Sequence, residues 1–166
     1  MFTYGQRLPI PEPMNKAWDL LGSDQIYVIN LDKRPDRLSN MKAIFNALEI
    51  QFTRMPAVDG TLHVTPQYLK DQGIRMMEGF SDHVFKNRPL TIGEIGCFMS
   101  HYHIWNTVVE QNLKEVIIFE DDIRFEPFFK QRFKLIREQL DHMDWDLVYL
   151  GRKILPNYEE EDWVKG

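Results

Sequence analysis

Three consecutive carboxylates, Glu120, Asp121 and Asp122, follow directly after the short apolar run at residues 116–119 (VIIF). A run of this kind predicts a buried strand, and open α/β sheets bind their ligands where the strands end. Adjacent carboxylates repel one another unless a positive charge neutralises them, and a hard divalent cation does so with oxygen ligands. The triplet therefore indicates a metal site that holds a phosphate-bearing substrate. In the alternative interpretation, one acid caps the following helix and the others are solvated.

The outer two acids of the triplet form an acid-x-acid motif. Side chains alternate along an extended segment, so Glu120 and Asp122 can point to the same side. Mg²⁺ and Mn²⁺ suit such oxygen ligands. A cation there would bridge a diphosphate and stabilise its charge as a leaving group.

A basic segment lies where the first predicted strand passes into a helix, and it carries Lys33, Arg34 and Arg37. The start of a helix presents free N–H groups and the positive end of its dipole, so this junction could bind phosphate. The alternative is an exposed helix start whose charges are balanced by Asp32 and Asp36. The segment has no glycine-rich fingerprint, which argues against a dinucleotide site and against a P-loop.

A third candidate segment begins at Thr91 and contains Gly93, Glu94 and Gly96. Thr91 and Glu94 have the spacing of a capping box, which predicts a helix start and gives Glu94 a structural alternative to catalysis. Glycines in the first turns of a helix are unfavourable, so we expect a close approach of backbone or ligand there.

The remaining nucleophilic and imidazole side chains of this helix give weak signals. Ser100 and His101 are neighbours in sequence and do not face each other on a helix, so a hydrolase triad has no support. His101 and His103 lie off the apolar face, and no His/Cys spacing suggests zinc. Cys97 is the only cysteine, which excludes an internal disulfide. We expect it to be a small apolar residue inside the helix.

Hydrophobic periodicity places these motifs on an α/β framework. Strands are expected at 26–29, 52–58, 116–119 and 146–150, long helices at 35–48 and 91–112, a short helix between Pro66 and Gly73, and an amphipathic helix carrying Phe129, Phe133, Ile136 and Leu140. In the helix at 91–112, one apolar face is formed by Ile95, Phe98, Tyr102, Trp105 and Val109. Residues 61–89 form an irregular excursion, and segments of this kind often carry binding contacts.

Composition narrows the class of protein. With 166 residues, 43% of them hydrophobic, the chain can bury one core. Its net charge of −5 argues against a nucleic-acid or anionic-membrane surface. No apolar stretch approaches the roughly 20 residues that span a bilayer. The polar, proline-containing start predicts neither a signal peptide nor an anchor.

Six segments together resemble glycosyltransferase family 25, and specifically its animal branch, the procollagen galactosyltransferases. They are YVINLDKRPDR at 27–37, AVDG at 57–60, RPLT at 88–91, GEIGCFMSHY at 93–102, FEDDIRFE at 119–126 and DWDLVY at 144–149. The resemblance implies a GT-A transferase with a Rossmann-like sheet, a divalent metal and a UDP-sugar donor. It further implies transfer of galactose from UDP-galactose to hydroxylysine of collagen, with inversion, in the lumen of the endoplasmic reticulum.

The resemblance also implies roles for individual residues. Glu120 and Asp122 would bind Mn²⁺ or Mg²⁺ and the diphosphate, with Asp121 beside them. The nucleotide side would be lined by Asn30, Arg34, Arg37 and Asp59. Gly93 and His101 would lie near the donor. No residue present is identified as the general base, for which Glu94 and His101 are the candidates.

The resemblance divides the chain into an extended proline-containing lead-in at 1–24, a family 25 domain at 25–155 and an acidic tail at 156–166. Family domains continue past the strand at 146–150, so we expect a C-terminally truncated, donor-binding part without signal peptide or retention tail. Two alternatives remain: a non-catalytic relative that acts as a binding module, and a receiver- or phosphatase-like domain that holds magnesium around an aspartyl phosphate.

Overall fold

The computed structural model describes residues 19–75 and 90–151. Within the described part, residues up to Phe125 belong to one compact unit and residues from Glu126 onward to a second. The predicted acidic tail and most of the predicted lead-in lie outside the described residues. No helix among those described is long and apolar enough to cross a membrane.

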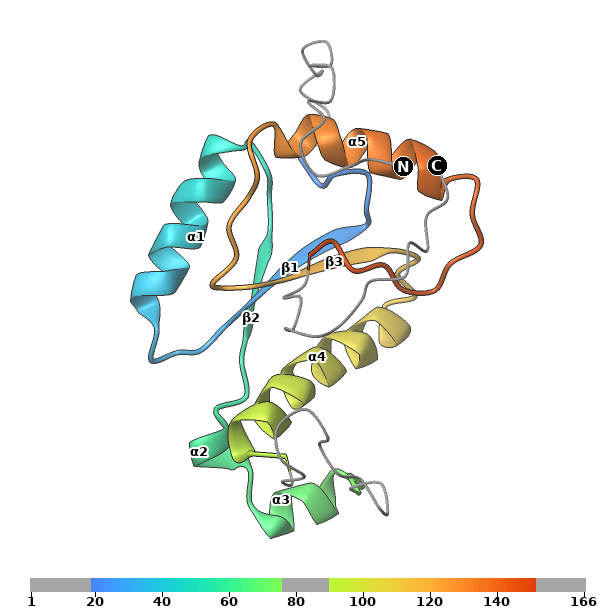
Figure 1. Cartoon of the computed structure of the whole chain (residues 1–166). Coiled ribbons are helices and arrows are strands. Elements are labelled where there is room, and N and C mark those ends of the chain that lie inside the picture. Colours follow the sequence, from blue (N-terminus) through green and yellow to red (C-terminus); the bar gives the residue numbers. More distant parts are fainter. Residues whose placement is uncertain (1–18, 76–89, 152–166) are drawn as a thin grey trace, which may run out of the picture. The chain divides into compact units, whose positions relative to one another are not determined.

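The larger unit is built on a parallel sheet of three strands, β1 (Gln25–Asn30), β2 (Thr53–Pro56) and β3 (Val116–Glu120). The strand order is β2-β1-β3 (Figure 1). Ile29 is paired with Glu120, so β1 and β3 end side by side. Because the chain leaves β1 towards β2 on one side and β3 lies on the other, these ends form a topological switch point, where α/β sheets place ligands. The predicted α/β fold is confirmed.

Helix α1 (Pro35–Ala47) covers one face of this sheet. It begins with a proline at its first position, which favours a helix start, and it buries Met41 and Phe45. The ring of Phe45 lies 5.6 Å from that of Phe119 on β3 and 5.4 Å from that of Phe125, both edge-on. This aromatic cluster packs the last turn of α1 against the end of β3.

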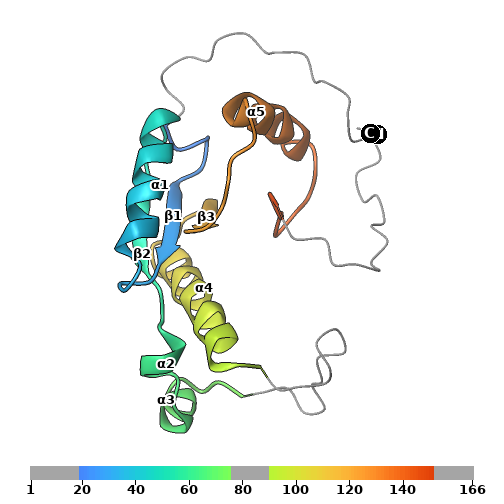
Figure 2. The ribbon, with the colours of Figure 1, turned by 60° about the vertical axis from the view of Figure 1, so that its left-hand side comes forward.

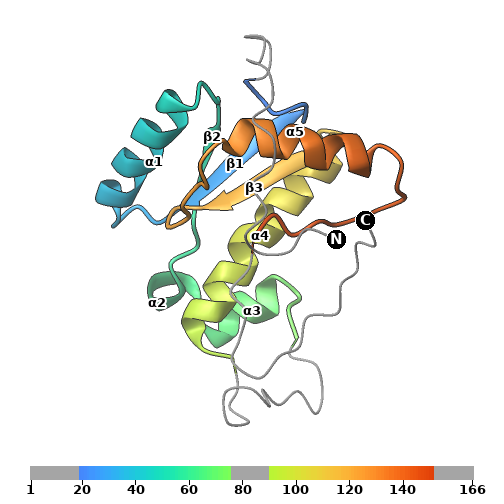
Figure 3. The ribbon, with the colours of Figure 1, turned by 45° about the horizontal axis from the view of Figure 1, so that its top comes forward.

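Helix α4 (Ile92–Glu110) covers the opposite face, where Ile104 packs with Tyr27 and Ile29 of β1 (Figure 3). Its buried residues are Gly96, Met99, Ser100 and Ile104. The apolar face expected from the sequence is instead largely exposed in the structure, with Phe98 and Trp105 each 45% exposed and Val109 79% exposed.

Small side chains explain which face of α4 is buried. A Cβ on Gly96 would lie 2.6 Å from the Val58 carbonyl oxygen, and one on Gly60 would lie 2.0 Å from the Ile92 carbonyl oxygen. Ser100 donates a hydrogen bond to the Gly96 carbonyl and accepts one from the Val58 N–H. The expected close approach at Gly96 is therefore one of backbone to backbone.

Two short helices lie beside the amino end of α4, as both views show (Figures 1 and 2). They are α2 (Gly60–His63) and α3 (Pro66–Asp71). Thr65 caps α3 by accepting a hydrogen bond from the Tyr68 N–H. The predicted short helix after Thr65 is confirmed, and α2 lies just before it at the start of the expected irregular excursion. Residues 76–89, the rest of the predicted excursion, lie outside the described residues.

The second unit contains α5 (Phe129–Leu140), the predicted amphipathic helix. Residues 146–150 form no strand, so that prediction is wrong. A strand needs hydrogen bonds to a neighbouring strand, and no strand of the described chain pairs with this segment. The strand expected at 52–58 is also shorter: it covers Thr53–Pro56 and ends where Pro56 pairs with Asn30, the last residue of its partner β1.

Candidate functional site

The carboxyl ends of β1 and β3 are joined by a side-chain hydrogen bond. Asn30, the last residue of β1, is 1% exposed. Its Nδ2 donates to Oδ2 of Asp121 at 2.7 Å and to the carbonyl of Arg34 at 3.0 Å. Its Oδ1 accepts from Nε of Arg54 on β2 at 3.0 Å. One buried amide thus connects all three strands and the start of α1.

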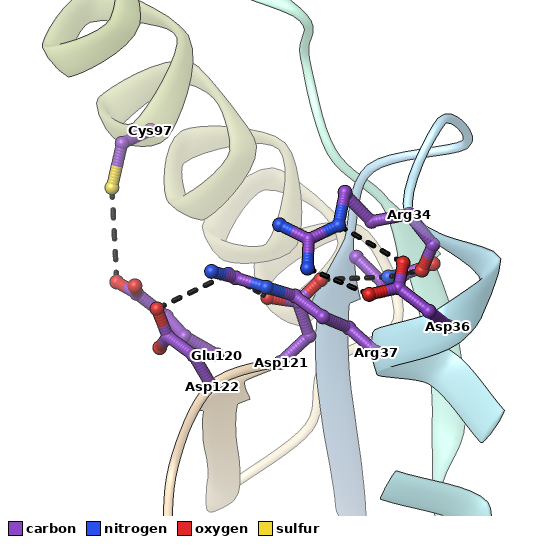
Figure 4. Close-up of polar contacts among 8 residues, drawn as sticks. Arg34, Asp36, Arg37, Cys97, Glu120, Asp121 and Asp122 are labelled. Carbon is purple, nitrogen blue, oxygen red and sulfur yellow. Dashed lines mark hydrogen bonds and ion pairs between the residues drawn. The ribbon is translucent and has the colours of Figure 1, made fainter. Parts of the chain in front are cut away.

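Arg37 of α1 lies over the acid triplet (Figure 4). Its Nη1 donates to Oδ1 of Asp121 at 2.9 Å and to Oδ2 of Asp122 at 3.1 Å. The hydrogen bond to Asp121 raises the pKa of Arg37. Asp121 is 9% exposed and has both oxygens in hydrogen bonds, so it holds Arg37 in place at the end of the sheet.

Arg34 and Lys33, the other cations of the basic segment, are also paired. Arg34 donates from Nε and Nη2 to the two oxygens of Asp36, at 2.9 and 2.7 Å. This fork lowers the pKa of Asp36 to about 2. The balance of Arg34 by Asp36 matches the alternative interpretation of the segment. Lys33 instead pairs with Asp59.

Asp59 is the amino-terminal cap of α2. Its carboxylate lies 2.5 Å from Nζ of Lys33 and accepts from the N–H and the hydroxyl of Thr61 at 3.0 and 2.6 Å. The hydrogen bond from Lys33, followed by that from Thr61, lowers the pKa of Asp59 to about 2. Asp59 therefore remains ionised at neutral pH and ties the start of α2 to the loop after β1.

Glu120 points to α4 and not to α1. Its Oε1 lies 3.4 Å from Nε2 of His101 and 3.7 Å from Sγ of Cys97. His101 lowers the pKa of Glu120. The pKa of His101 is raised to about 9, first by Cys97 and then by Glu120. The partners of Glu120 thus lie on α4, whereas the partner of Asp122 lies on α1.

Cys97 is exposed, which corrects the expectation of a buried apolar residue. It is four residues from His101, a spacing that places both side chains on one face of a helix. The four-residue spacing could be read from the sequence, but the two residues indicate a site only once the fold places Glu120 beside them. Among the described residues, these are the only three or more His, Cys, Asp or Glu side chains that lie close enough together to share a metal ion.

Glu94 and Gly93 lie at the start of α4. Oε2 of Glu94 accepts from the N–H of Thr91 at 2.7 Å, and Oγ1 of Thr91 accepts from the N–H of Glu94 at 3.3 Å. The predicted capping box is confirmed. A Cβ on Gly93 would meet only Thr91 Oγ1 at 3.9 Å, so the backbone at Gly93 is accessible.

The structure therefore brings four of the predicted residues into one network: Asn30, Arg37, Asp121 and Asp122. Glu120 adjoins it with His101, while Arg34, Asp59, Glu94 and Gly93 have the separate environments described above. Exposed carboxylates and a guanidinium at a switch point can bind a cation together with a phosphate group.

Comparison with known proteins identifies the family. The model of glycosyltransferase family 25 (LPS biosynthesis protein) matches residues 23–163. The chain belongs to this family. The matched residues include all three strands of the sheet and the acid triplet.

Individual family 25 relatives are similar over most of this chain. A glycosyltransferase 25 family member of Aedes aegypti is 44% identical over 89% of the chain and 24% of its own length. Procollagen galactosyltransferase 1-B of Xenopus laevis is 41% identical over 91% of the chain and 25% of its own length. A probable inactive glycosyltransferase 25 family member 3 of Bos taurus is 41% identical over 88% of the chain and 24% of its own length. The chain spans about a quarter of the length of these relatives.

Proposed function

We propose that this chain is the donor-binding part of a family 25 glycosyltransferase that transfers galactose from UDP-galactose to hydroxylysine of collagen. Membership of the family supports glycosyl transfer from a nucleotide sugar. The similarity to procollagen galactosyltransferase 1-B supports the galactosyl donor and the collagen acceptor. The same similarity favours the lumen of the endoplasmic reticulum as the place of action.

The observation that carries this proposal is the position of Arg37 between two acids at the topological switch point. Asp121 holds the guanidinium from the buried side, whereas Asp122 contacts it from a side chain that is 57% exposed. An arginine held in this way is positioned to donate to a diphosphate. Arg34 and the N–H groups at the start of α1 lie next to it and add positive potential.

The divalent cation, Mn²⁺ or Mg²⁺, is assigned to Glu120 and Asp122. Both carboxylates are accessible, with side chains 52% and 57% exposed, and both supply the oxygen ligands these cations require. When bound, the cation would neutralise the diphosphate and stabilise it as a leaving group. Arg37 contacts only Oδ2 of Asp122, so the other carboxylate oxygen of Asp122 would remain available to the cation.

The other predicted residues have supporting roles in the proposal. Asn30 supports the nucleotide side from a buried position, Asp59 holds the loop after β1 through Lys33, and Gly93 gives the donor access to the backbone of α4. Glu94 and His101 are the candidates for a catalytic acid or base, since both are titratable groups on the helix that faces Glu120. Asp121 positions Arg37.

A second candidate function is a non-catalytic relative that binds a nucleotide sugar or a protein partner. The specific observation in its favour is the similarity to a bovine relative whose name describes it as probably inactive. The two candidates differ in turnover, not in donor binding.

The test is calorimetric titration of UDP into the purified chain, with and without Mn²⁺. Wild type is compared with Glu120→Ala/Asp122→Ala and with Glu110→Gln. Glu110 is an exposed acid nine residues beyond His101 on α4, about 13 Å further along the helix. We expect Mn²⁺-dependent binding in wild type and in Glu110→Gln, and its loss in the double variant.

Absence of UDP binding by a folded wild-type chain would contradict a working donor site. Where binding is seen, release of labelled galactose from UDP-galactose to a hydroxylysine peptide separates the two candidates. Transfer supports the enzyme, whereas binding without transfer supports the binding module.

A further inference from the structure

We propose that Cys97, His101 and Glu120 form a binding site for a borderline divalent cation such as Zn²⁺, separate in its ligand chemistry from the oxygen site of Glu120 and Asp122. Their ligand atoms all lie within 4.8 Å of one another. This inference does not depend on the proposed transferase activity, because it follows from the side chains alone.

The distances from the Glu120 oxygen to the other two ligand atoms fit a tetrahedral metal, and the sulfur and the nitrogen lie within 4.8 Å of each other. Zinc binds sulfur at about 2.3 Å and nitrogen or oxygen at about 2.0–2.1 Å. With tetrahedral angles, those bond lengths place a sulfur and an oxygen ligand about 3.5 Å apart, and a nitrogen and an oxygen ligand about 3.3 Å apart. The structure has 3.7 Å from Cys97 Sγ to Glu120 Oε1 and 3.4 Å from His101 Nε2 to the same oxygen. A cation can therefore enter with only small side-chain movements.

The types of ligand select the class of cation. A thiolate and an imidazole together favour Zn²⁺ and its neighbours over Mg²⁺ and Mn²⁺, which prefer oxygen. Three protein ligands leave the fourth tetrahedral position for water or an oxygen of a bound molecule. The site is open to solvent, since Cys97 is exposed and the side chains of His101 and Glu120 are 26% and 52% exposed.

The backbone that carries the ligands belongs to a helix and a strand. Cys97 and His101 are one helical turn apart on α4, whose start is fixed by the capping box and by the backbone contact at Gly96. Glu120 is the last residue of β3, which is paired along its length with β1. The ligands are thus held on two elements of regular structure, and little conformational entropy is lost when a cation binds.

The shared ligand has a consequence for the donor site. A cation held by Cys97, His101 and Glu120 occupies the carboxylate that the oxygen site also requires. Zn²⁺ should therefore compete with Mn²⁺-dependent UDP binding, and the competition should disappear when Cys97 and His101 are replaced.

The experiment is a titration of the metal-free chain, without an affinity tag, with Co²⁺ and then Zn²⁺. Co²⁺ reports a thiolate ligand through a sulfur-to-metal charge-transfer band, and Cys97 is the only cysteine that can supply it. Zn²⁺ affinity is obtained by displacement of Co²⁺ and by calorimetry. The variants are Cys97→Ser, His101→Gln and Asp122→Asn, with Glu110→Gln as the matched control, and circular dichroism verifies that each is folded.

We expect the charge-transfer band in wild type, Asp122→Asn and Glu110→Gln, its loss in Cys97→Ser, and Zn²⁺ binding weakened at least about tenfold in Cys97→Ser and His101→Gln. Mn²⁺-dependent UDP binding should survive in Cys97→Ser and be lost in Asp122→Asn. The proposal is overturned if folded wild type shows no band, or if either ligand variant binds Zn²⁺ as tightly as wild type. Loss of UDP binding alone contradicts the donor site and leaves the zinc result unaffected.

Discussion

Asn30 holds the switch point together from a buried position. Its side chain makes hydrogen bonds to Asp121, to the carbonyl of Arg34 and to Arg54, which belong to three different elements or their ends. A buried amide with each polar atom paired stabilises one arrangement, because any other leaves a donor or acceptor unsatisfied. The position of Arg37 over the acids therefore depends on a residue that itself need not touch a donor.

Replacement of Asn30 by alanine should destabilise the chain. Asn30→Ala leaves Oδ2 of Asp121 and the guanidinium of Arg54 without this partner, and we expect the free energy of unfolding to fall by about 1–3 kcal/mol. Urea unfolding followed by circular dichroism measures it. The matched control is Asn46→Ala at an exposed position of α1, which should change stability by about 0.5 kcal/mol or less. Equal effects of the two substitutions would contradict the role of Asn30.

The acid triplet shows what a sequence can and cannot indicate at the residue scale. The apolar run before it predicts its place at the end of a strand, and the structure confirms that place. Alternation along a strand favours Glu120 and Asp122 on the same side, but their present partners differ. His101 is 19 residues from Glu120, and Arg37 is 85 residues from Asp122. Contacts across such separations depend on how the helices pack, which local periodicity does not determine.

Helix α4 shows the same limit at the scale of an element. Its start could be predicted, because a capping box is a local hydrogen-bonding pattern. Its buried face could not, because Gly96 and Ser100, the residues that permit close packing, have small side chains that add nothing to the hydrophobic pattern. The segment at 146–150 has a strand-like composition but no paired strand among the described residues, since pairing is a property of the sheet and not of the segment.

The two glycines of α4 should respond in opposite ways to alanine. A Cβ at Gly96 would meet the Val58 carbonyl oxygen at 2.6 Å and the Gly60 nitrogen at 2.9 Å, both backbone atoms that cannot rotate away. We expect Gly96→Ala to lower the free energy of unfolding by about 1–3 kcal/mol. Gly93→Ala meets open space and should leave it unchanged or raise it by up to about 1 kcal/mol through helix propensity. Thermal and urea unfolding of both variants test this, and an equal loss in both would contradict the packing argument.

For the molecule as a whole, the basic segment is neutralised by internal acids. Lys33, Arg34 and Arg37 each pair with a carboxylate although the chain carries a net charge of −5. Several of these pairs link elements that are distant in sequence, so protonation of the acids removes contacts that hold the fold together. The free energy of unfolding at acidic pH therefore measures the contribution of these ion pairs.

Asp59 should make a measurable contribution to that acid sensitivity. Its pKa is about 2 in the folded chain, below its ordinary value of 3.8, because Lys33 and Thr61 donate to the carboxylate. A lowered folded-state pKa stabilises the fold fully above pH 3.8, and this contribution is lost as the pH falls towards 2. Asp59→Asn should therefore be less stable than wild type at pH 7, with a difference that shrinks between pH 4 and pH 2.

Urea midpoints across that range test the prediction, and Asp36→Asn, which removes a second acid with a pKa of about 2, should behave in the same way. A stability difference between wild type and Asp59→Asn that stays constant with pH would contradict the prediction. It would mean that the charge of Asp59 contributes nothing and that only its hydrogen bonds matter.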